Sequence, residues 1–238
     1  MTQFSDDLYV GAAYYPPANV LATRTDSSTN GVEIPRLVVQ QFGAVVVADP
    51  NGICDAVTST AAGTLSATGA LMSGATAVFD VPRNLSITST GNLSGLTFSF
   101  AGEDEYGETT TEDITGPNNT TVYGLKAFLL VGAPTTTAAV STAVNVGSGP
   151  ALGFSHRLAD KGKLLGIYVN GQADSTATAT TTVVTAGLST TAVSTATTGD
   201  VRGTVVPTTT PDSSKLFSAL ILLGGNQTKE QVYGVSQA

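Results

Sequence analysis

The sequence is poor in the side chains that carry most enzyme chemistry. Its 238 residues include one histidine, His156, one cysteine, Cys54, and no tryptophan. A zinc site needs several Cys or His ligands, and a Ser–His–Asp triad would have to use His156, beside which no nucleophile is marked out. We therefore predict no enzyme activity, no metal and no cofactor. A single cysteine cannot form an intrachain disulfide, and we expect Cys54 to be a reduced thiol.

Charged residues are also scarce, at 12% of the chain against roughly 25% in an average domain. The 10 basic residues are scattered and outnumbered by 18 acidic ones, which gives a net charge of −8. Without a basic cluster to neutralise phosphates, we expect no direct nucleic-acid binding. No apolar run approaches the roughly 18 residues of a membrane-spanning helix, and the first residues lack the basic and apolar regions of a Sec signal peptide. We expect no membrane partner.

Small and β-branched residues make up much of the chain, which has 38 Thr, 20 Ser and 26 Gly. This composition favours strands and turns. The predicted fold class is all-β: an antiparallel β-sandwich or jelly-roll-like fold with an extended N-terminal arm. We place the arm at residues 1–40 and the β core at 41–238, and a smaller β subdomain around 171–215 remains an open alternative.

The expected arm is stiffened by proline and rich in aromatic residues. Pro16-Pro17 and Pro35 resist helix and favour extended backbone. Aromatic side chains on an extended segment need a surface that covers them. Two interpretations stay open: the arm packs on the protein's own sheet, or it reaches a neighbouring subunit. The candidate partner-contact residues are Phe4, Tyr9, Tyr14 and Tyr15.

Residues 81–131 show the clearest strand pattern, because apolar residues there alternate with Thr and Ser at a period of two. Turn sequences rich in Gly, Asn and Pro separate the alternating segments. This arrangement predicts an antiparallel meander. The expected strands cover 85–88, 96–100, 109–114 and 122–131.

Four further segments predict strands. Residues 37–48 and 216–223 are continuous apolar runs typical of buried strands. Residues 164–169 form a strand that ends at Asn170-Gly171, a strong hairpin signal. The Thr/Ala-rich stretch 174–198 is either low-complexity disorder or strands, and its many β-branched residues favour strands.

One acidic segment is the only candidate ion site. Six of the 18 acidic residues fall within 11 positions: Glu103, Asp104, Glu105, Glu108, Glu112 and Asp113. Oxygen-rich loops can bind Ca²⁺, although this spacing does not match an EF-hand. The alternative interpretation is a solvated hairpin tip whose charges guard the sheet edge.

Three motifs stand out as a set: Asp80-Val81-Pro82-Arg83-Asn84 with the strand that follows, Leu96–Asp104 (LTFSFAGED), and Thr115-Gly116-Pro117-Asn118. They resemble motifs of virion structural proteins of tailed bacteriophages, and the resemblance covers about half of the chain. The segments 199–204 (GDVRGT), Pro211-Asp212 and 232–238 (VYGVSQA) are similar to the close of small phage head proteins.

The resemblance implies a capsid decoration, or cement, protein. Such a protein binds the outer surface of the shell formed by the major capsid protein and bridges neighbouring capsomers. It further implies self-association, as a homotrimer, and a location on the virion after synthesis in the cytoplasm of the host bacterium, with no catalytic residues. Two alternatives stay open: a head-fibre, tail or adaptor component of the virion, or a carbohydrate-binding or adhesin module. Sugar platforms usually present tryptophan, which is absent here.

Overall fold

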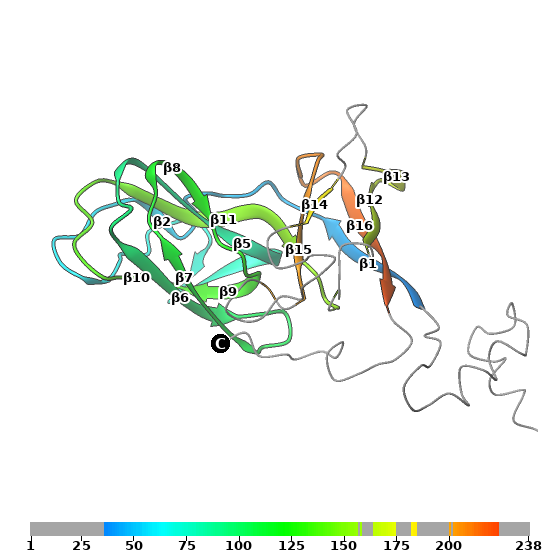
Figure 1. The fold of residues 1–238 in the computed structure, drawn as a ribbon, viewed down its shortest axis with the longest axis horizontal. Helices are drawn as coiled ribbons and strands as arrows, with labels where there is room; N and C mark the ends of the chain where they lie inside the picture. Colours follow the sequence, from blue (N-terminus) through cyan, green and yellow to red (C-terminus); the bar gives the residue numbers. More distant parts are fainter. Residues whose placement is uncertain are drawn as a thin grey trace, which may run out of the picture.

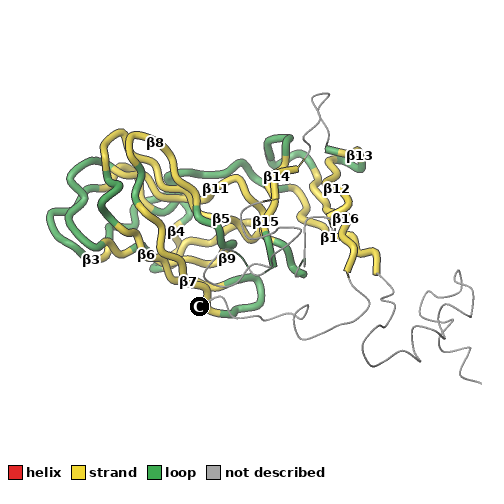
Figure 2. Tube along the Cα trace, viewed as in Figure 1, coloured by secondary structure: helices red, strands yellow, loops and turns green. Residues whose placement is uncertain are grey.

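The computed structural model describes residues 36–156, 158, 164–174, 182–184, 200 and 202–223. These residues form β-strands joined by loops and turns, and they contain no helix (Figure 2). Every strand pairing among them is antiparallel. The predicted all-β, antiparallel fold class is therefore confirmed.

Four strands form a small sheet at one end of the molecule (Figure 1), which we call the terminal sheet. In spatial order they are β1 (Arg36–Ala44), β16 (Leu216–Leu223), β12 (Leu164–Val169) and β13 (Gln172–Ala173). The first and last described residues, Arg36 and Leu223, lie opposite each other in this sheet. Residues near the two ends of the chain thus meet here.

The remaining twelve strands form a second, larger sheet. In spatial order its main path is β14-β15-β11-β5-β9-β6-β10-β3, with β2, β4, β7 and β8 beside it. In chain order the strands are β2 (Cys54–Val57), β3 (Gly63–Thr64), β4 (Met72–Ser73), β5 (Thr76–Asn92), β6 (Thr97–Glu103), β7 (Thr109–Thr115), β8 (Asn118–Tyr123), β9 (Phe128–Gly132), β10 (Thr135–Thr136), β11 (Val144–Gly153), β14 (Thr182–Val184) and β15 (Thr204–Pro207).

Strand β5 allows this sheet to enclose a core, because it changes partners along its length. Residues 76–78 pair with β9, whereas residues 85–89 lie between β11 and β8. The register shifts between Val78 and Arg83, and Pro82 falls in this interval, where a missing ladder hydrogen bond costs little. One strand therefore belongs to both walls of the sandwich.

The sandwich, by which we mean β2–β10 with residues 144–148 of β11, surrounds a core of small and aromatic side chains. Alternation on β6 buries Phe98 and Phe100 and leaves Thr97 and Ser99 at least partly exposed, as predicted from the period of two. The other large buried members are Ile53, Leu65, Phe79, Leu85, Ile87, Leu93, Ile114 and Phe128.

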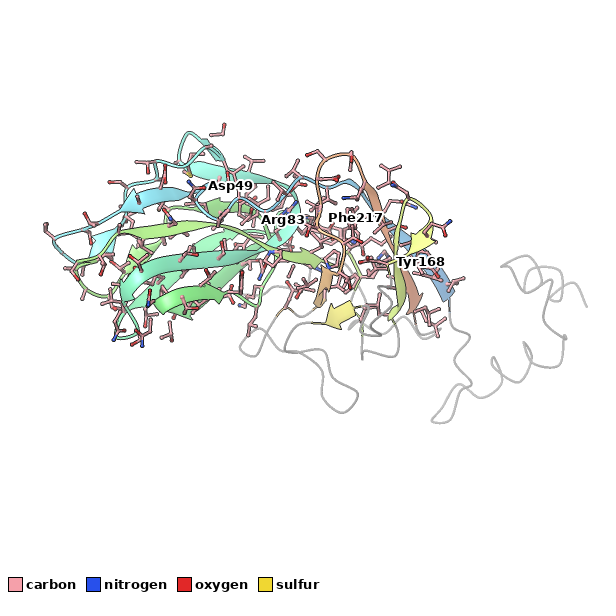
Figure 3. All side chains as sticks on the ribbon, turned by 90° about the horizontal axis from the view of Figure 1, so that it is seen from above. Asp49, Arg83, Tyr168 and Phe217 are labelled. Atoms are coloured by element: carbon pink, nitrogen blue, oxygen red, sulfur yellow. The ribbon has the colours of Figure 1, made fainter. Side chains whose placement is uncertain are left out.

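A second core lies between the terminal sheet and the far end of β11 together with β15. Phe217, Ala219 and Ile221 of β16 are buried on its inner face. From the other side it is closed by Leu152, Phe154 and Val205. In Figure 3, Arg83 lies between Asp49 of the β1–β2 connection and Phe217 of the terminal sheet along the long axis. Because β11 contributes to both cores, the two parts form one continuous body.

Several sequence predictions hold in detail. Strand β16 covers residues 216–223, and β12 covers 164–169. Asn170 and Gly171 both have positive φ, at 50° and 77°, as a type I′ hairpin turn requires. In the 174–198 stretch the structure describes residue 174 and strand β14.

Other predictions need correction. Residues 37–48 are not buried on both faces, since Leu37 and Val39 are 61% and 54% exposed. The expected strand 122–131 is interrupted: β8 ends at Tyr123 and β9 begins at Phe128. The region is not a simple meander, because β5 pairs with β8 and β9 rather than with β6.

The structure describes only part of the two regions whose boundaries were predicted, the arm and the possible subdomain. Residues 36–40, assigned to the arm, are the first residues of β1. Between 171 and 215, β13 joins the terminal sheet whereas β14 and β15 join the larger one, so the described part of this range forms no separate subdomain.

Candidate functional site

The turn between β6 and β7 folds around one buried carboxylate, that of Asp104. Its Oδ1 accepts hydrogen bonds from the N–H groups of Tyr106 (2.8 Å) and Glu108 (3.1 Å). Its Oδ2 accepts a hydrogen bond from Nη2 of Arg202 at 2.5 Å, and both side chains are almost fully buried. The Arg202 guanidinium also lies 5.3 Å from the centre of the Tyr106 ring, within the range of a cation–π contact. The acidic turn is thereby tied to the segment before β15.

A second buried carboxylate, Glu112, lies on β7. Its Oε1 accepts a hydrogen bond from the N–H of Leu125 at 2.5 Å and a longer one from Lys126 at 3.4 Å. Burial raises the pKa of Glu112 to about 7, although these N–H groups and the charge of Lys126 act in the opposite direction. Burial likewise lowers the pKa of Lys126, whose Nζ donates to the carbonyl of Thr111 at 2.6 Å. A carboxyl group that titrates near neutrality therefore sits inside the fold.

Asp200 joins these two groups. Its Oδ2 accepts a hydrogen bond from the N–H of Ala127 at 2.8 Å. Its Oδ1 accepts hydrogen bonds from the N–H groups of Arg202 (2.8 Å) and Gly203 (3.1 Å). One carboxylate therefore holds the β8–β9 connection against the segment before β15. We refer to Asp104, Glu112, Lys126, Asp200 and Arg202 as the charge cluster.

The acidic turn also contacts the terminal sheet. Tyr106 Oη donates to the carbonyl of Ser155 at 2.8 Å, and Ser155 Oγ donates to Glu105 at 3.1 Å. The Ser155 N–H in turn donates to Oε1 of Gln40, a buried residue on β1, at 3.0 Å. Burial raises the pKa of Glu105. A continuous chain of hydrogen bonds thus connects the β6–β7 turn to β1.

The segment Asp80–Asn84 forms a second polar group, which we call the clamp, with Arg83 and Asn84 buried and Asp80 exposed to solvent. Arg83 is 1% exposed and forms a two-pronged ion pair with Asp80, at 2.7 and 3.0 Å. Asp80 accepts the N–H of Val46 at 2.9 Å, and Arg83 Nη2 donates to the carbonyl of Val46 at 2.5 Å. The backbone N–H and carbonyl of Val46 therefore both bind side chains of the clamp, which attaches the β1–β2 connection to β5.

Asn84, the last residue of the clamp, bridges the β8–β9 connection and strand β11. Its Nδ2 donates to the carbonyl of Gly124 at 3.0 Å, and its Oδ1 accepts the N–H of Ala151 at 2.9 Å. A Cβ on Gly149 would lie 2.3 Å from this Oδ1, so glycine is needed there for close approach.

An apolar groove opens beside the clamp. It has a volume of about 320 Å³ and is lined by Val46, Val47, Asp49, Leu71, Val78, Phe79, Asp80 and Ser148. Three of its valines are well exposed: Val46 at 38%, Val47 at 57% and Val78 at 47%. Asp49 and Asp80 add carboxylates to this lining. The groove can therefore receive an apolar side chain from a partner. A more polar hollow of about 550 Å³ lies along the loop 58–64 with Val140 and Ser141.

The charge cluster and the clamp act on the fold itself. Most of their charged atoms bind protein groups, and the described residues include no group of three or more His, Cys, Asp or Glu side chains placed to hold a metal ion. Buried Oε2 of Glu112 and Nη1 of Arg202 have no hydrogen-bond partner within the described structure. Cys54 is fully buried, and burial raises the pKa of its thiol to about 12, which makes it unreactive.

The sequence-predicted sites have different outcomes. Phe4, Tyr9, Tyr14 and Tyr15 of the arm lie outside the described residues. The acidic segment is the predicted hairpin, but it is not simply a solvated tip, since Asp104 is 2% exposed and Glu105 and Glu112 are partly buried. Sequence analysis missed the groove and the buried role of Arg202. The only sequence feature that pointed to Arg202 was its position in the motif 199–204, which is one of those that carry the resemblance.

No helix among the described residues has the length and apolar character needed to cross a membrane. Comparisons with models of known protein families, with curated proteins and with solved structures gave no match.

Proposed function

We propose that this chain is a capsid decoration protein of a tailed bacteriophage, which binds the outside of the shell and stabilises it by bridging neighbouring capsomers. One observation carries the proposal. Motifs that are far apart in the sequence, and that carry the resemblance to virion proteins, bind one another. Asp104 of one motif forms an ion pair with Arg202 of another, 98 positions along the chain.

The other motif residues support the same conclusion. Asp80, Arg83 and Asn84 join β5 to the β1–β2 connection, to the β8–β9 connection and to β11. Gly116 and Pro117 are buried and hydrogen-bond to the segment 93–96. These residues therefore hold together segments that lie far apart in the sequence, which supports the interpretation of the motifs as one set.

The groove beside the clamp offers a surface for the shell. Exposed valines at its mouth and Phe79 in its lining give it an apolar character, and burial of one large apolar side chain contributes about 1.5–3 kcal/mol. The aromatic arm is the second proposed contact. Two tethered contacts on adjacent capsomers raise the effective concentration of each, so that bursting the shell must break both.

The number of copies per particle tests the proposal most directly. Quantitative mass spectrometry of purified particles of the phage that encodes this chain should find hundreds of copies, in a fixed ratio to the major capsid protein. A handful of copies per particle would instead assign the chain to a tail, head-fibre or adaptor position. Absence from purified particles would overturn the proposal.

The two contacts can be tested separately by adding purified protein to particles that lack it. Val47→Asp places a charge in the groove and should weaken co-sedimentation at least tenfold. Deletion of residues 1–34 removes the arm but keeps β1, and it should also weaken binding. Tyr123→Asp, on an equally exposed side chain of β8 (52%), is the matched control and should bind normally.

A further inference from the structure

The terminal sheet is apolar on both of its faces. Direct pairing across antiparallel strands places opposite residues on the same face. Phe217, Ala219 and Ile221 lie on the inner face, in the second core. The outer face carries the alternate residues, with Leu37 opposite Leu222 and Val39 opposite Leu220, while the next pair, Gln41 and Ser218, is polar. Tyr168, opposite Ser218, extends this face onto β12. A sheet exposed to water on one side normally alternates apolar and polar residues, so this outer face is unusual.

Charge is nearly absent from the terminal sheet. Arg36 is the only charged residue in β1, β12, β13 and β16, and it stands at the end of β1. The chain as a whole carries 18 acidic residues and a net charge of −8. Two copies that approach through most other surfaces bring like charges together. Through the terminal sheet they do not.

Strand β1 is also an edge of the sheet among the described strands. Natural edge strands are usually protected by charged side chains or proline. From Leu37 to Ala48 the sequence contains neither. The single irregularity is the register shift between Gln41 and Gly43, which leaves residues 37–41 as a regular, unprotected edge.

We propose that a second copy of this chain packs against the outer face of the terminal sheet and its β1 edge. The inference rests on the proposed function, because the resemblance behind it implies self-association, and it identifies the surface that mediates this self-association. An uncharged apolar face on an acidic protein is complementary to itself, because it needs no opposite charge from a partner.

The location of the chain ends agrees with this assignment. Residues 1–35 and 224–238 are attached to Arg36 and Leu223, which lie opposite each other at one end of the terminal sheet. Both terminal segments therefore start beside the proposed contact. An arm that begins here lies within reach of the neighbouring copy.

Light scattering coupled to size exclusion tests the surface with the full chain. The wild-type protein should have the mass of two or three chains, and Val39→Lys should reduce it to one. Tyr123→Lys is the matched control, since Tyr123 has a similar exposure (52% against 54%) on a strand of the sandwich and lies outside the groove. It should retain the oligomer.

A second measurement guards against misfolding of the variant. Hydrogen exchange at the β1 amides should be slow in the concentrated wild-type protein and at least tenfold faster in Val39→Lys, with unchanged protection of β6 and β7. A monomeric wild-type protein, or an oligomer that survives Val39→Lys, would overturn the proposal; the first result would assign the face to a terminal segment of the same chain. Neither result bears on the copy number per particle, so the proposed function is tested independently.

Discussion

The sandwich and the terminal sheet bury their residues in different ways. The sandwich encloses apolar side chains together with ionised groups, and its clamp and the neighbouring charge cluster each hold a cation against carboxylates. The terminal sheet buries only uncharged residues, among them Phe217 and Ile221, and has one charged residue in four strands. One part of the molecule is fixed by directional polar contacts and the other by apolar packing.

This difference matters because the two kinds of burial respond to different perturbations. A buried ion pair contributes little net stability, but removal of one partner is costly since the other charge stays buried. An apolar core responds instead to changes in volume. The polar contacts of the sandwich specify which segments meet, whereas the neutral terminal sheet is suited to contact with another copy.

The largest expected effect comes from breaking the buried ion pair. Arg202→Met removes the countercharge of Asp104 and should lower the free energy of unfolding by about 3–5 kcal/mol, measured by urea denaturation. Lys215→Met is the control, because Lys215 binds Asp212 at the same 2.5 Å distance but on the surface. The control should unfold at the wild-type urea concentration. Equal losses in the two variants would contradict the distinction between buried and exposed pairs.

The second prediction concerns the close approach of β11 to the β1–β2 connection. A Cβ on Gly147 would lie 2.0 Å from the carbonyl oxygen of Asp49, which is backbone and cannot easily move. Gly147→Ala should therefore cost about 1–3 kcal/mol of folding free energy. Gly132→Ala on β9 is the control, since its Cβ would have ordinary contacts at 3.5 Å. Chemical denaturation of the two variants side by side would show whether crowding at β11 is the cause.

The local parts of this fold could be predicted from the sequence. The alternation of Phe98 and Phe100 with polar residues marked β6, and Asn170-Gly171 marked the β12–β13 hairpin, because both signals lie within a few neighbouring residues. The apolar run 216–223 gave the bounds of β16. It could not say which face is covered, since that depends on a partner strand far away in the chain.

Long-range contacts could not be predicted. Nothing local to Asp104 indicates Arg202, and nothing local to Pro82 shows that β5 continues through it while changing partners. The break between β8 and β9 has the same origin. A side chain at Gly124 would meet the Glu112 carboxylate at 2.4 Å, a constraint that comes from β7. The groove is also lined by segments that lie far apart in the sequence, so no single motif could predict it.

The third prediction concerns the pH dependence of the free energy of unfolding, which we attribute to Glu112 of the charge cluster. The pKa of Glu112 is raised from 4.5 to about 7 in the folded protein, so the folded state binds more protons than the unfolded chain between these values. The free energy of unfolding should therefore fall as the pH rises through this window. The groups that face Glu112 are Lys126 and Asp200.

Glu112→Gln removes the cost of keeping a charged carboxylate buried at high pH, and it keeps an oxygen that accepts the hydrogen bond from the Leu125 N–H. Each unit of pKa shift corresponds to about 1.4 kcal/mol, and the new amide has a burial cost of its own. We expect a gain on the order of 1–2 kcal/mol at pH 8 and a reduced slope between pH 5 and 8, with Glu105 accounting for part of what remains. Urea titrations at several pH values measure both quantities. A slope identical to that of the wild-type protein would exclude Glu112 as its source.

The smallest expected effect tests whether the terminal sheet can be destabilised while the stability of the sandwich stays unchanged. Gly171 has a φ of 77° in the β12–β13 turn, a conformation that costs an L-residue with a Cβ about 1 kcal/mol. Gly171→Ala should therefore destabilise the terminal sheet slightly, and Gly171→Asn should do so less, because asparagine tolerates this conformation. Hydrogen exchange should become faster at the amides of β12 and β16 and stay unchanged at those of β6 and β7. Equal acceleration in both regions would mean that β11, which contributes to both cores, makes them unfold as a single unit.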